Sequence, residues 1–134
     1  ILRKSGTHVP EGIVALNVDE AVNAAKTIMK KTGTDTVAIK AQVHAGGRGK
    51  GGGVKIAKSI EDVKKFAEEI LGMTLITPQT GPHGKLVRKV LIEEGIYQPG
   101  PSEIKELYVS ILLNRTIGRY MVVYSRKEEW ILKP

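Results

Sequence analysis

A glycine-rich stretch that follows a lysine is the part of this sequence best suited to chemistry. Residues 36–53 read TVAIKAQVHAGGRGKGGG, in which an apolar run ends at Lys40 and six glycines then surround Arg48 and Lys50. Glycine allows positive φ angles and a close approach of the backbone to a ligand, while lysine and arginine donate hydrogen bonds to phosphate oxygens. The stretch is therefore predicted to be a phosphate-binding loop.

Three well-known phosphate motifs do not describe this loop. Gly47, Gly49 and Gly52 match the dinucleotide fingerprint G-x-G-x-x-G, but that motif opens a helix, and the residues that follow here, VKIA, are typical of a strand. A Walker loop needs Ser or Thr where this chain has Gly51. In protein kinases the glycine-rich loop comes before the lysine strand, whereas here Lys40 precedes the glycines. A flexible linker remains the alternative, although linkers are rarely preceded by an apolar run.

The composition is that of an ordinary folded domain. The 134 residues are 41% hydrophobic and 26% charged, and no apolar run approaches the roughly 18 residues of a membrane span. The absence of cysteine excludes disulfides and thiolate metal sites, and the three histidines, His8, His44 and His83, lack the spacing of metal ligands. The net charge of +7 leaves open a noncatalytic module that binds nucleic acid or another polyanion, although aromatic residues are only 4%.

An α/β (α+β) fold with two helices packed on a mainly antiparallel sheet is predicted around the loop. Asn17 and Ser59 are predicted to cap helices that end at Gly33 and Gly72, because apolar residues recur at helical spacing after each cap. A long turn is expected over residues 74–85. Strands are expected at residues 12–16, 36–40, 54–57, 87–93, 106–114 and 120–125, the last two as a hairpin.

Four segments stand in an order that a known enzyme family shares. They are the strand that ends at Lys40, QVHAGGRGK at residues 42–50, LIEE at 91–94 and KELY at 105–108. In this order they resemble the nucleotide-binding part of succinyl-CoA synthetase β subunits, which are ATP-grasp proteins. The resemblance implies an N-terminal ATP-grasp subdomain.

The resemblance also implies an activity, a partner and cofactors. In that family the β subunit binds ATP or ADP with Mg²⁺, and a separate α subunit carries the histidine that is phosphorylated, so no residue of this chain is expected to be catalytic. Together the subunits interconvert succinate, CoA and ATP with succinyl-CoA, ADP and phosphate in the citric acid cycle. Pro10 stands where ATP-using members tend to carry proline, which favours ATP over GTP. Another acyl-CoA ligase of the superfamily, such as malate–CoA ligase, is the alternative.

Two groups of nucleotide contacts carry over from the family. Lys40 matches the lysine that contacts phosphate, and Gly47, Arg48 and Gly49 match the triplet of the loop that covers it. This assignment agrees with the chemistry of the residues, which combine cationic donors with an open backbone. The phosphate-binding loop is therefore predicted twice, from composition and from resemblance.

Two glutamates are expected to contact the rest of the nucleotide. Glu93 matches the end of a strand where the family holds adenine, largely through backbone groups. Glu106 matches a family glutamate that contacts the nucleotide, and a carboxylate is suited to accept hydrogen bonds from both hydroxyls of a ribose. The simpler alternatives are a solvated carboxylate at the strand end for Glu93 and a surface salt bridge for Glu106.

The resemblance covers residues 1–125 and leaves 126–134 as a tail of uncertain origin. In the family a second subdomain follows and holds the Asn and Asp ligands of Mg²⁺, so no metal ligand is expected among the present residues. Because phosphoryl transfer depends on that metal, these residues are expected to be part of a longer β subunit and inactive alone. A cytoplasmic location is favoured over the mitochondrial matrix. No ligand is assigned to residues 96–103, where the chain is longer than is usual in the family.

Overall fold

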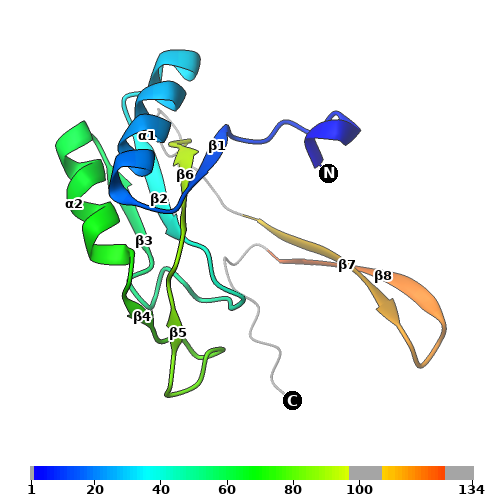
Figure 1. Cartoon of the computed structure of the whole chain (residues 1–134). Coiled ribbons are helices and arrows are strands. Elements are labelled where there is room, and N and C mark those ends of the chain that lie inside the picture. The colour runs from blue at the N-terminus through cyan, green and yellow to red at the C-terminus, as the bar shows by residue number, and fades with distance from the viewer. Residues whose placement is uncertain (1, 97–106, 126–134) are drawn as a thin grey trace. The chain divides into compact units, whose positions relative to one another are not determined.

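A computed structural model gives the fold of residues 2–96 and 107–125 (Figure 1). The chain divides into two compact units, residues 1–96 and 97–134, which are described separately. The first unit contains a 3₁₀ helix, two α-helices and six strands. In chain order they are the 3₁₀ helix Leu2–Ser5, β1 (Gly12–Ala15), α1 (Val18–Thr32), β2 (Val37–Ala41), β3 (Val54–Ala57), α2 (Ile60–Ile70), β4 (Thr74–Leu75), β5 (Lys85–Leu86) and β6 (Val90–Glu94).

A four-stranded antiparallel sheet in the order β1-β6-β2-β3 forms the centre of the first unit. Both helices lie on one side of it (Figure 1). Side chains alternate across a strand, so Val37, Ile39 and Ala41 of β2 are buried against the helices. Lys40 of β2 and Glu93 of β6 therefore project from the opposite face of the sheet. The predicted antiparallel arrangement of strands with two packing helices is confirmed.

The helix boundaries follow the predicted caps, with one correction. The side chain of Asn17 accepts a hydrogen bond from the Glu20 N–H, and α1 ends before Gly33, which has a φ of 73°. Ser59 caps α2 in the same way. The prediction that α2 stops at Gly72 was slightly wrong: the helix ends at Ile70 with Leu71 as its C-cap.

The segment predicted as one long turn at residues 74–85 contains ordered strand pairing at its ends. The short strands β4 and β5 pair with each other, and the backbone N–H of Val87 donates to Met73 O at 2.9 Å. Leu75 and Val87 are fully buried, and burial of these two side chains stabilises a pairing too short to recognise in the sequence. The predicted strand at 87–93 accordingly begins later, at Val90.

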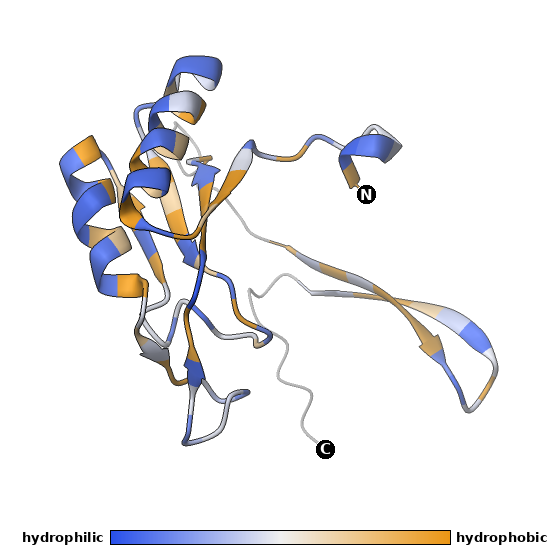
Figure 2. Cartoon of the chain, in the orientation of Figure 1, coloured by the Kyte–Doolittle hydropathy of each residue, from blue (hydrophilic) through white to orange (hydrophobic). Residues whose placement is uncertain are grey.

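The second unit contains the predicted hairpin. Strands β7 (Tyr108–Asn114) and β8 (Arg119–Ser125) pair in antiparallel register from Tyr108 opposite Ser125 to Asn114 opposite Arg119. At the turn, the side chain of Asn114 accepts a hydrogen bond from the Thr116 N–H. The hairpin is rich in apolar residues (Figure 2).

No helix in the described residues is long and apolar enough to cross a membrane.

Candidate functional site

An ion pair occupies the sheet face that the helices leave uncovered. Lys40 Nζ lies 2.9 Å from Glu93 Oε1, and the two side chains are only 23% and 20% exposed. The pair is diagonal across neighbouring strands, because Lys40 lies opposite Leu91 and Glu93 lies opposite Ala38. The carboxylate of Glu93 is thus engaged by a residue that was predicted, independently, to bind phosphate.

The glycine loop follows β2, which ends at Ala41, and folds back on itself. Its closing bonds run from Gly51 N to Gly47 O at 3.2 Å, from Gly52 N to Gly49 O at 3.1 Å and from Gly53 N to Arg48 O at 2.8 Å. These bonds make residues 47–53 a compact turn. The loop is therefore an ordered element at the end of β2, unlike the flexible linker considered above.

The guanidinium of Arg48 turns back toward the strand. Its Nη1 donates a hydrogen bond to the carbonyl oxygen of Ala41 at 2.8 Å, one residue beyond Lys40. This bond brings the second predicted phosphate cation to the same end of β2 as the first. Since a guanidinium has five N–H donors in a planar fork, one bond to the backbone leaves the group chemically able to recognise an anion as well.

The outer part of the loop has the open backbone that a phosphate site requires. Gly47 has a φ of 70°, a conformation that favours glycine. At Gly49 an added Cβ would meet no heavy atom within 4 Å, so the backbone there is open to a ligand. The structure thus fits a phosphate group at the loop, with Lys40 and Arg48 as the cationic donors.

Sequence reasoning missed the residues that support the loop. Gln79 Oε1 accepts a hydrogen bond from the Gly46 N–H at 2.7 Å, and Gln79 belongs to a turn that also contains the buried Thr77. This turn lies in the segment interpreted only as a long connection. Its sequence, Thr-Pro-Gln-Thr-Gly at residues 77–81, signals a turn, but nothing in it indicates which loop it contacts.

The predicted site residues fall into two groups. Lys40, Gly47, Arg48, Gly49 and Glu93 all belong to the first unit, where the uncovered sheet face and the loop at its edge hold them together. Glu106 lies outside the described residues, as does the tail at 126–134.

The described residues do not supply a metal site. Within ranges 2–96 and 107–125, no three His, Cys, Asp or Glu side chains gather closely enough to hold an ion. The chemistry of the donors at the glycine loop is also wrong for Mg²⁺, which prefers carboxylate oxygens and water to lysine and arginine. The Mg²⁺ expected from the resemblance therefore does not fit this part of the chain, and no step is derived through it.

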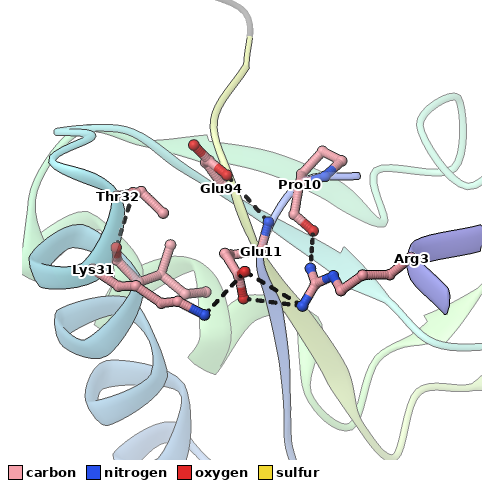
Figure 3. Close-up of polar contacts among 7 residues, drawn as sticks. Arg3, Pro10, Glu11, Lys31, Thr32 and Glu94 are labelled. Atoms are coloured by element: carbon pink, nitrogen blue, oxygen red, sulfur yellow. Dashed lines mark hydrogen bonds and ion pairs between the residues drawn. The ribbon is translucent and has the colours of Figure 1, made fainter. Parts of the chain in front are cut away.

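A second polar cluster lies where β1 and β6 meet (Figure 3). The Glu11 carboxylate pairs with Lys31 at 3.0 Å and with Arg3 at 3.3 Å, while the Glu11 N–H donates to Glu94 Oε2 at 3.1 Å. The hydrogen bond from Lys31, with smaller contributions from Arg3, holds the pKa of Glu11 below its ordinary value of 4.5. The cluster joins the 3₁₀ helix, α1 and the end of β6 one residue beyond Glu93.

The sequence matches an ATP-grasp family model and a set of similar proteins. The family model of the ATP-grasp domain matches residues 1–128. The ADP-forming succinate–CoA ligase subunit beta of Flavobacterium johnsoniae is 59% identical over 125 residues, which are 93% of this chain and 32% of that protein. The subunits of the same name from Flavobacterium psychrophilum and Ralstonia pickettii are 58% and 59% identical over 93% of this chain, which is 31% and 30% of their own lengths. The chain thus spans about a third of the length of these relatives.

Proposed function

The chain belongs to the ATP-grasp domain family, and on that basis we propose that it binds ATP or ADP at the glycine loop. The observation that carries the proposal is the junction of β2 with the loop. There Lys40 and Arg48 bring two cations to the same strand end, and the backbone of Gly49 is open to a ligand. Such a combination of cationic side chains and an open glycine backbone suits a phosphate chain.

Each predicted contact has a role in this proposal. Lys40 and Arg48 bind phosphate oxygens, and Gly47 and Gly49 let the backbone approach them. Glu93 holds Lys40 in place before the nucleotide arrives and lies at the strand end where adenine is expected. Glu106 is proposed to accept hydrogen bonds from the ribose.

The ligase reaction is proposed for the longer β subunit to which these residues belong. We propose that residues 1–125 form the N-terminal nucleotide-binding subdomain of a succinate–CoA ligase β subunit, and that residues 126–134 lie beyond it. With an α subunit and Mg²⁺, the enzyme interconverts succinate, CoA and ATP with succinyl-CoA, ADP and phosphate, in the cytoplasm. The names of the relatives support succinate as the acid and ADP as the product nucleotide. Acid-dependent turnover of the complete enzyme distinguishes succinate from malate.

Titration of the 134-residue chain with ATP tests the proposal directly. Arg48→Ala should remove most of the affinity, because it deletes a phosphate contact and the bond that holds the loop to Ala41. Arg115→Ala is the matched control, since it removes the same charge from the turn of the β7–β8 hairpin. Equal losses in both variants, together with a steep fall in affinity with salt, would instead indicate a basic polyanion-binding module.

A further inference from the structure

We infer that Gln79 is a positioning residue for the glycine loop and fixes it in the shape that accepts phosphate. The inference rests on the proposed nucleotide function. Gln79 Oε1 accepts the N–H of Gly46 at 2.7 Å across 33 residues of sequence. Because Gly46 directly precedes Gly47, this bond fixes the start of the triplet that is proposed to cover the phosphates.

The turn that carries Gln79 is itself firmly held. The Thr77 N–H donates to Thr80 Oγ1 at 2.8 Å, the Gln79 N–H donates to Thr77 Oγ1 at 3.2 Å, and the Thr80 N–H donates to Thr77 O at 3.1 Å. Thr77 is 5% exposed and is the only buried polar residue in the described parts of the chain. Hydrogen bonds of this kind hold a turn in a single conformation, so the side chain of Gln79 starts from a fixed backbone.

The loop also lies directly against this turn. A Cβ added at Gly47 would be 3.5 Å from Pro78 Cδ, and one added at Gly51 would be 2.7 Å from Ile76 O. In contrast, Gly49 at the outer part of the loop has open space around it. The inner side of the loop is thus packed against the turn, and the hydrogen bond from Gly46 holds the chain directly before the packed Gly47.

This arrangement matters for binding because a loop that is already ordered loses less conformational freedom when a ligand arrives. Without the Gln79 bond, Gly46 and the triplet after it would sample other conformations. ATP affinity should then fall by about two- to tenfold, the range that corresponds to the net contribution of one hydrogen bond. Affinity for adenosine, which has no phosphate, should not change.

A double-mutant cycle between Gly46 and Gln79 tests the inference. Gly46 does not have a positive φ, so alanine is compatible with its backbone. Its added Cβ would lie 2.7 Å from Gln79 Nε2 and 2.9 Å from Oε1, which displaces a flexible side chain and breaks the bond. Gly46→Ala and Gln79→Ala therefore remove the same interaction, and the double variant should bind ATP no more weakly than either single one.

The measurements are ATP and adenosine titrations of the 134-residue chain and hydrogen exchange of the Gly46 amide. Asn23→Ala, on the exposed side of α1, is the control and should bind ATP normally. Support for the inference consists of weaker ATP binding in both single variants, no additivity, unchanged adenosine affinity and faster Gly46 exchange in Gln79→Ala. If Gln79→Ala fails to fold, Gly46→Ala gives the same comparison with the Thr77–Thr80 turn intact.

Three results would overturn the inference. Unchanged ATP affinity in Gln79→Ala, or additive losses in the double variant, would show that Gln79 does not position the loop, while the proposed nucleotide function would stand. A complete lack of ATP binding by the unsubstituted chain would overturn both.

Discussion

One methyl group added at Gly51 should destabilise the fold, whereas the same addition at Gly49 should not. A Cβ at Gly51 would lie 2.7 Å from the carbonyl oxygen of Ile76 and 2.8 Å from Leu75 Cδ1, and the backbone oxygen cannot move without shifting the turn that follows β4. Overpacking of this kind costs about 1–3 kcal/mol. Neither glycine has a positive φ, so both variants also gain about 0.4–1 kcal/mol because alanine restricts the unfolded chain.

The net expectation is a loss of up to about 2.6 kcal/mol for Gly51→Ala and a gain of about 0.4–1 kcal/mol for Gly49→Ala, so the two variants should differ in stability by about 1–3 kcal/mol. Urea unfolding followed by circular dichroism measures both. In thermal unfolding each kcal/mol corresponds to about 4–8 °C for a unit of this size. Equal stabilities for the two variants would refute the reasoning, because the loop would then not lie against Ile76 and Leu75. The two glycines provide a matched pair, since neither has a positive φ and they differ in what surrounds an added Cβ.

Substitutions at three further positions test separate parts of the structure. Lys40→Met should cost about 1–2 kcal/mol in urea unfolding, between the values for exposed and buried ion pairs, because it leaves the largely buried Glu93 unpaired. It should also weaken ATP binding about tenfold or more, since a hydrogen bond to a charged group is lost. Asn17→Ala should lower the free energy of unfolding by about 1 kcal/mol, because the α1 N-cap is lost. Asn17→Ser should retain most of the stability, because serine can also cap the helix. The pKa of Glu11 is lower in the folded state than its ordinary value, so its contribution to stability is present above pH 4.5 and is lost as the pH falls through the folded value. In Glu11→Gln the melting temperature should therefore fall less steeply with decreasing pH below pH 4.5 than in the unsubstituted chain. An equally steep fall would contradict the role of the cluster.

The elements that sequence predicted well are those that local interactions determine. Asn17 and Ser59 cap their helices through bonds to residues three positions ahead, and the apolar run before Lys40 forms the buried strand β2. The hairpin partners β7 and β8 are close in sequence. Predictions based on residue type and spacing were sufficient for these elements.

The elements that sequence did not predict depend on contacts between distant segments. The pairing of β4 with β5 follows from burial of Leu75 and Val87, which no local pattern indicates. The Lys40–Glu93 pair joins residues 53 positions apart. It forms because β6 and β2 are neighbours in the sheet, an order that the sequence does not reveal. The same holds for Gln79, whose partner Gly46 becomes apparent only when the glycine loop is placed against the turn at residues 77–80.

The most direct test of the central claim is an NMR titration of the 134-residue chain with ATP, in which amide shifts are followed residue by residue. We expect saturable shifts concentrated at Lys40, Gly47, Arg48, Gly49 and Glu93, and adenosine should reproduce only those near Glu93. Small shifts spread over surface lysines and abolished by moderate salt would contradict it, because they would show that ATP is attracted by net charge alone and that the glycine loop is not a nucleotide site.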